Sequence, residues 1–254
     1  MPNRREGRRE SSHRSAFFCV RFVIGLAACQ LIVMTSIAKG DSLTSVLRPW
    51  IASNIHIAPD KNGRPQLFIR TQDVLADIRS AAPWIVQDTR ILIGVLADAF
   101  RLRSEFTRTN PNLFVVIAPQ ISDERQPNRT LLRELGLPDS AIDIIGRTET
   151  WANGCGAYAF RDSSGHVSVS IVAADTRLEP KIMQDCILTG VVLSFGLRIN
   201  TKSSVNAADG YYQYVVLGRA LRLCSEEINA DQTSRGDFAD RVADCAANFM
   251  TSNL

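Results

Sequence analysis

Histidine is scarce in this sequence, with His13, His56 and His166 the only three among 254 residues. None follows residue 166, so the C-terminal third cannot carry the two histidines one helical turn apart that bind zinc in the metalloprotease motif H-E-x-x-H. The sequence also lacks a G-x-S-x-G nucleophile elbow, a P-loop and a C-x-x-C pair. We therefore expect no metal and no cofactor, and the protein classes that depend on those motifs are not supported.

Excess charge is also missing from most of the chain. The formal charge is +3, but residues 1–38 carry +4 and the remainder carries −1. A composition of 45% hydrophobic and 22% charged residues is that of a folded globular protein and excludes a disordered chain. The near-neutral remainder lacks the basic surface that binds DNA or RNA, so we expect no nucleic-acid partner.

The first 38 residues have the parts of a secretory signal peptide. An arginine-rich start is followed by an uncharged apolar run over residues 22–38, and Ser36 and Ala38 are the small residues that precede a cleavage site. This pattern predicts a signal peptide over 1–38, cleaved after Ala38. Two alternatives remain open: residues 22–38 stay as a membrane anchor, or Cys29 is lipidated. In each case the protein is exported, periplasmic or secreted, and touches the membrane only through this leader.

Four cysteines remain after the leader, namely Cys155, Cys186, Cys224 and Cys245. An even number in an exported chain predicts disulfide bonds, for which four cysteines allow three pairings. Cys224 follows a predicted helix over 211–223, and Cys245 lies within one predicted over 237–250. A bridge between these two cysteines would join a C-terminal helical hairpin.

The pattern along the mature chain predicts an α+β fold. We expect an irregular entry segment over 39–64 and then a single domain over 65–254. Its small sheet should pack on a buried central helix. The predicted strands are 67–69, 113–118, 158–161 and 167–173; the predicted helices are 71–81, 85–106, 129–135, 141–147, 179–197, 211–223 and 237–250.

The helix over 179–197 is the most distinctive of these elements. From residue 186 onward it is apolar on nearly all sides, which indicates a central, buried helix. Gly190 in its middle predicts a close backbone approach, because glycine costs about 1 kcal/mol in a helix interior.

Val167, Val169 and Ile171 alternate with serines, which predicts a strand with one buried face and one solvent-exposed face.

Three segments carry a resemblance to a known family: WANGC at 151–155, the hairpin that continues to Ile171, and CILTGVVLSFGL at 186–197. They resemble the bacterial exported family called domain of unknown function 2927. Cys186, Gly196 and Leu197 match its helix pattern, whereas Thr189, Gly190 and Leu193 replace polar or acidic residues. The resemblance implies a disulfide between Cys155 and Cys186.

The same helix is similar to the metzincin motif H-E-x-x-H-x-x-G-x-x-H when Gly196 is aligned with the motif glycine. The ligand positions then hold Thr189, Leu193 and Ile199, and the general-base position holds Gly190. Leucine and isoleucine cannot bind zinc, and glycine cannot accept a proton. This similarity implies a degenerate zincin-like core without metal or catalytic residues.

Other candidate residues have a functional and a structural interpretation. Cys155 is a thiolate nucleophile or a disulfide partner, and export favours the disulfide. A group of acidic residues near the last helix has two interpretations: a cation-binding site, or a solvent-exposed cap of the helix. A group of aromatic residues also has two: the lining of a ligand groove, or part of the hydrophobic core. The acidic residues are Glu226, Glu227 and Asp231; the aromatic residues are Trp151, Tyr211, Tyr212 and Tyr214.

These observations favour a non-catalytic protein of the cell envelope that binds a protein or peptide. The mechanism we expect is strand addition, in which a peptide pairs with the strand over 167–173, which has one solvent-exposed face. One alternative is an unrecognised hydrolase that uses polar residues at Asp162, His166, Asp175 and Glu226. A second alternative is a structural envelope component without a discrete site.

Overall fold

The computed structural model describes residues 43–123, 126–139, 142–143, 154–199, 207–228 and 235–252. The predicted signal peptide, its cleavage after Ala38, the anchor over 22–38 and the lipidation of Cys29 all lie outside these residues. None of the helices built from the described residues has the length and hydrophobicity of a membrane-spanning helix.

The fold is α+β, as the sequence predicts. Its helices are α2 (Leu43–Asn54), α3 (Pro83–Ala99), α4 (Arg129–Glu134), α6 (Pro180–Ser194), α7 (Ala207–Glu227) and α8 (Arg235–Ser252). Its strands are β1 (Ile57–Pro59), β2 (Pro65–Leu67), β3 (Val74–Ser80), β4 (Ser104–Phe106), β5 (Leu113–Ala118), β6 (Ser122–Asp123), β7 (Gln126–Pro127), β8 (Cys155–Arg161) and β9 (Val167–Asp175).

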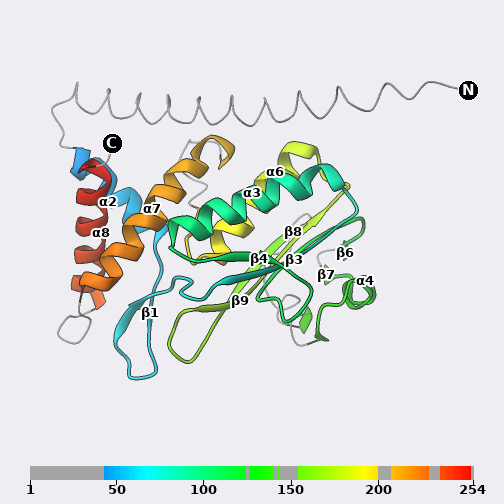
Figure 1. Ribbon diagram of the computed structural model, residues 1–254, viewed down its shortest axis with the longest axis horizontal. Helices are drawn as coiled ribbons and strands as arrows, with labels where there is room; N and C mark the ends of the chain where they lie inside the picture. The colour runs from blue at the N-terminus through cyan, green and yellow to red at the C-terminus, as the bar shows by residue number, and fades with distance from the viewer. Residues whose placement is uncertain are drawn as a thin grey trace, which may run out of the picture.

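Five strands form one mixed sheet (Figure 1), and their order is β4-β3-β5-β9-β8. The first four strands in this order are parallel, and β8 pairs antiparallel with β9. The predicted hairpin is therefore present. Its second strand, however, lies inside the sheet between β5 and β8.

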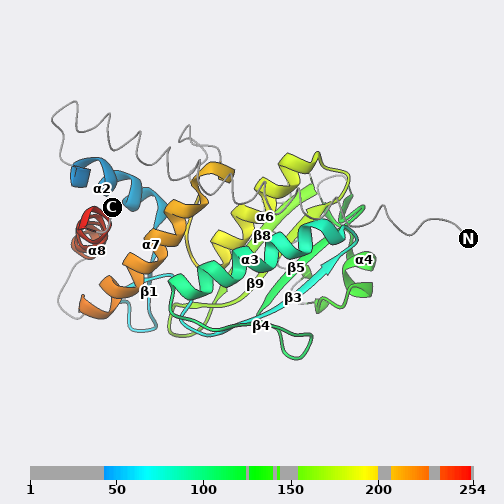
Figure 2. The ribbon, with the colours of Figure 1, turned by 45° about the horizontal axis from the view of Figure 1, so that its top comes forward.

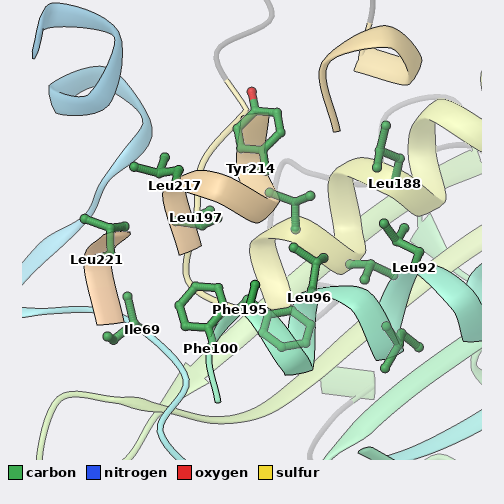
Figure 3. Packing of buried hydrophobic residues seen from close by; sticks show 14 of the residues in the cluster. Ile69, Leu92, Leu96, Phe100, Leu188, Phe195, Leu197, Tyr214, Leu217 and Leu221 are labelled. Atoms are coloured by element: carbon green, nitrogen blue, oxygen red, sulfur yellow. The ribbon is translucent and has the colours of Figure 1, made fainter. Parts of the chain in front are cut away.

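Helices α3 and α6 lie side by side over one face of the sheet (Figure 2). The main core forms beneath and beside them, where Phe100 and Phe195 lie with ring centroids 5.4 Å apart (Figure 3). The opposite face of the sheet is covered by α4 and the residues that follow it, through a smaller cluster that includes Val116 and Leu132. Because both faces are covered, the central strands are apolar on both sides.

The C-terminal helical hairpin is also present, formed by α7 and α8. The segment expected to be irregular, 39–64, contributes to the same core, because α2 packs on α8 and Ile51 is fully buried. The same segment contains β1, which pairs with β2. Residues 43–64 of the entry segment are thus a structured part of the fold.

Two predicted helices differ in the structure. The segment expected as a helix over 71–81 contains β3, which pairs with β4 and β5. Pro83 occupies the first turn of α3, where the amide that proline lacks would have no partner within the helix. The long helix expected over 85–106 ends at Ala99. The last three residues of the predicted range, Ser104–Phe106, form β4 instead.

Candidate functional site

Helix α6 crosses the sheet so closely that Gly190 is required by packing. A Cβ atom added at this position would lie 3.1 Å from the Ala157 Cβ atom on β8 and 3.0 Å from Val172 Cγ2 on β9, and it would overlap Val172 Cγ1. The predicted close backbone approach is confirmed. At the general-base position of the metzincin alignment, the glycine is therefore explained by contact with the sheet. Gly196, whose φ is +88°, lies just after the end of α6 at Ser194.

Two disulfide bonds hold the elements around α6. Cys155 at the start of β8 is bonded to Cys186 on α6, and Cys224 on α7 is bonded to Cys245 on α8. Both predicted pairings are confirmed, and Cys155 is a disulfide partner rather than a free thiolate. Such bonds are typical of proteins in an oxidising compartment.

The strand expected to bind a peptide is not at an edge. Val167, Val169 and Ile171 belong to β9, whose two neighbours are β5 and β8. The prediction of strand addition along 167–173 is therefore wrong. Its alternating serines indicated a wet face, but Ser170 is fully buried and Val169 is only partly buried. The sequence could not reveal that another strand pairs on each side.

Among the described residues, β8 is one of the two edge strands of the sheet, and β4 is the other. The Ser170 amide donates to the Asn112 carbonyl at 2.9 Å, so the main chain at Ser170 points toward β5. Ser170 pairs with Ala159, and main-chain groups alternate in direction along a strand. The amide and carbonyl groups of Cys155, Ala157 and Ala159 consequently point away from the sheet.

The side chains of β8 differ between its two faces. Ala157 faces α6, and Cys155 is tied to that helix by its disulfide. Tyr158 and Phe160 lie on the α4 side as a T-shaped pair, with ring centroids 4.7 Å apart, and both are partly exposed. Arg161 at the end of the strand is exposed. The edge thus combines main-chain groups that point away from the sheet, unpaired among the described residues, with an aromatic pair on one face.

A separate pocket of about 380 Å³ brings together His166 and Glu226, two of the residues suggested for a hydrolase. It lies between the β1–β2 hairpin, the turn before β9 and the end of α7 (its lining also includes Gln66, Arg222 and Ser225). The His166 ring contacts the Gln66 side chain, and Glu226 pairs with Arg222 at 3.2 Å. Burial lowers the pKa of His166, so the ring favours its neutral form.

The other two residues suggested for a hydrolase have structural partners. The Asp162 carboxylate accepts hydrogen bonds from the backbone amides of Ser164 and His166, which orders the turn before β9. Asp175, at the end of β9, pairs with Arg177 at 2.7 Å. Burial would raise the pKa of Asp175, but hydrogen bonds from Arg177 outweigh it and hold that pKa below its ordinary value.

The aromatic and acidic candidates are only partly visible in the structure. Tyr214 is buried, donates to Asn54 Oδ1 at 3.2 Å and belongs to the core, and burial raises its pKa to about 12. Tyr212 is partly buried on the same helix, and Glu227 is exposed at its end. Trp151, Asp231 and the Tyr211 side chain lie outside what the structure describes.

No metal-binding group of three or more histidine, cysteine, aspartate or glutamate residues occurs among the described residues. Of the three ligand positions in the metzincin alignment, Thr189 and Leu193 lie on α6 and are partly buried, and Ile199 packs against the core just beyond it. His56, which contacts Arg198 and Phe68, has different partners from His166. The described part of the chain therefore offers no assembled metal centre.

Sequence reasoning missed Arg70, which is fully buried. Its Nε donates to the Ser194 carbonyl at the end of α6 at 2.9 Å, and its Nη2 donates to Ser170 Oγ at 2.8 Å and to the Asn112 carbonyl at 3.3 Å. Desolvation lowers the pKa of Arg70 to about 10. A cation at a helix C-terminus is favourable, so Arg70 fixes α6 on the sheet. The only signal in the sequence is an arginine next to an apolar run.

No protein-family model, curated protein or solved structure matches this chain. The resemblance to domain of unknown function 2927 and to a metzincin-like helix therefore stays a prediction.

Proposed function

We propose that this protein acts outside the cytoplasm as a non-catalytic module that binds an extended peptide along the outer edge of β8. The observation that carries the proposal is the row of outward main-chain groups at Cys155, Ala157 and Ala159. In strand addition, such groups bind the main chain of the ligand by hydrogen bonds. The peptide would extend the sheet beyond β8.

The composition of β8 supports this role. Natural proteins protect exposed sheet edges with very short strands, charged side chains, prolines or bulges. At the opposite edge, β4 is only three residues long. By contrast, β8 has seven residues, no proline, and a charged side chain and register irregularity only at its Arg161 end. A long edge with so little protection is expected where another chain pairs.

The surroundings of β8 favour a preformed site. The Cys155–Cys186 bond ties the start of the strand to α6, and the contact at Gly190 holds the same helix close to it. A rigid edge loses little conformational entropy when a ligand binds, which favours affinity.

The non-catalytic part of the proposal rests on the sequence. Thr189, Leu193 and Ile199 occupy the metzincin ligand positions, and Gly190 occupies the general-base position. The proposed location follows from the leader, with cleavage after Ala38, and is supported by the two disulfide bonds. In this proposal the scaffold is zincin-like, and its peptide groove is kept without its chemistry.

The test uses protein purified after export with both disulfides intact. Peptides selected from a displayed random library would be mapped by amide hydrogen exchange. Binding at β8 should slow exchange at the outward amides of Ala157 and Ala159. Protection confined to another region, or a library that yields no binder, would overturn the proposal.

A matched pair of variants sharpens this test. Ala159→Pro removes one outward amide, and proline is tolerated on an edge strand where its missing donor faces away from the sheet. Ala159→Ser keeps the amide and serves as the control. We expect the proline variant to lose peptide binding while both variants unfold near the wild-type temperature. Equal binding by the two folded variants would contradict strand addition.

A further inference from the structure

The two faces of β8 are chemically different, and this difference restricts which peptides fit. Because Ala157 and Ala159 point their main-chain groups outward, they would form the hydrogen-bonded pairs with an added antiparallel strand. Tyr158 and Phe160 would then occupy the non-hydrogen-bonded pairs. In such pairs the opposing Cα atoms are about 4.5 Å apart and the side chains lie closest together.

The aromatic pair supplies a surface for two ligand side chains. Tyr158 and Phe160 lie on the same face, are partly exposed, and contact each other edge to face. Cross-strand pairs of an aromatic residue with a β-branched or aromatic residue stabilise a sheet. Two apolar ligand residues separated by one position would therefore lie against Phe160 and Tyr158, and the residue between them would face the α6 side.

Charge fixes the position of the peptide along the edge. Arg161 is exposed, lies over the Phe68 ring at 5.9 Å from its centroid, and has no ion-pair partner among the described residues. The strand carries no acidic residue. An acidic ligand residue opposite Arg161 would add an attractive cross-strand pair, and a basic one would be repelled.

We propose that the ligand is an extended peptide segment with the pattern acidic–apolar–any–apolar, bound antiparallel to β8. Its acidic residue faces Arg161, its first apolar residue faces Phe160 and its second faces Tyr158. This inference rests on the proposed function, since it specifies the ligand of the same edge. Antiparallel pairing is chosen because it is slightly more stable per residue than parallel pairing.

The probe is the peptide KSEVTVSK, compared with its scrambled form KSVETSVK and its reversed form KSVTVESK. Binding would be measured by fluorescence anisotropy and mapped by hydrogen exchange at β8. Two apolar pairs and one charge pair should give about a tenfold preference for the first peptide. If all three peptides protect the β8 amides with equal affinity, the pattern is refuted while the proposed function stands. If none protects them while library-selected peptides do, the pattern is refuted and the proposed function again stands; if no peptide of either kind protects them, both fail.

Charge reversal provides the sharper variant. Arg161 is exposed, so Arg161→Glu should leave the fold intact. It should reverse the preference toward KSKVTVSK, in which lysine replaces the acidic residue. Tyr158→Ser, checked for wild-type circular dichroism, should abolish the preference for an apolar residue at the second apolar position and keep the preference at the first, which faces Phe160. An unchanged preference in either folded variant would overturn the inference. So would a dimer in size-exclusion chromatography whose β8 amides are already protected without peptide, because the occupant would then be a second copy.

Discussion

Replacing Gly190 with alanine is expected to destabilise the protein, although alanine is the better helix former. The change adds one methyl group to the face of α6 that lies on β8 and β9. That methyl group would overlap Val172 Cγ1 and approach the Ala157 Cβ atom to 3.1 Å. Val172 is fully buried, so its side chain has little room to move. The helix and the sheet would have to separate.

The size of the effect follows from two opposing contributions. Alanine gains up to about 1 kcal/mol over glycine in a helix interior. Overpacking a well-packed core costs typically about 1–3 kcal/mol. Because the overlap is with a buried β-branched side chain on an interior strand, we take the upper part of that range. The net loss is then about 1–2 kcal/mol, or roughly 2–8 °C in Tm at about 2–4 °C per kcal/mol.

Gly94 in α3 is the matched control. A Cβ atom there would meet only Ser104 Oγ, at 3.9 Å, which is an ordinary contact. Gly94→Ala should therefore stabilise the protein by about 0.5–1 kcal/mol through helix propensity alone. Urea unfolding of both variants, with disulfides intact and equal m-values, measures the difference. A Gly190→Ala protein at least as stable as wild type would refute the packing argument and leave the glycine unexplained.

Three further predictions concern the C-terminal bridge, the pocket and α4. Replacing Cys224 and Cys245 together by serine should lower the free energy of unfolding by about 3 kcal/mol, the chain-entropy value for a loop of this length; an unchanged urea midpoint would contradict this. Burial lowers the pKa of His166 in the folded protein, so as pH falls below about 6.5 the histidine is protonated more readily in the unfolded chain. The free energy of unfolding should therefore decrease as pH decreases in this range. His166→Gln should flatten that part of the Tm–pH curve, and parallel curves would exclude His166 as the cause. Asn128 caps α4 by accepting from the Leu131 amide, so Asn128→Ala should cost about 1 kcal/mol in urea unfolding; no loss would show that the cap contributes nothing.

The sequence predicted well those features that depend on residues within one helix, strand or turn. The buried helix α6 was evident from apolar residues on all sides, and Gly190 indicated the close contact that the structure contains. Turn residues between two apolar segments predicted the β8–β9 hairpin. Cys224 directly follows one predicted helix and Cys245 lies on the next, so their bond also followed from local pattern and position.

Prediction failed where the outcome depended on a distant partner. Residues 74–80 have a composition that fits a helix or a strand, and pairing with β4 and β5 decided for the strand. On α3, Ile91 is exposed, while the neighbouring Leu92 and Leu96 lie in the core. An amphipathic pattern gives a period, but neighbouring helices select the face that is buried.

By itself the sequence determined the α+β class, the central helix, the hairpin and the Cys224–Cys245 pair, because periodicity, turn residues and the positions of cysteines beside predicted helices are local properties. The Cys155–Cys186 pair was expected only from the family resemblance. Only the tertiary structure decided the order of the strands. That order makes β8, rather than β9, the edge that can accept another chain, and it encloses Arg70 among carbonyl groups from three segments. The physical reason is that hydrogen bonds between strands join residues far apart in the chain. No local pattern records which partner a strand will have on each side.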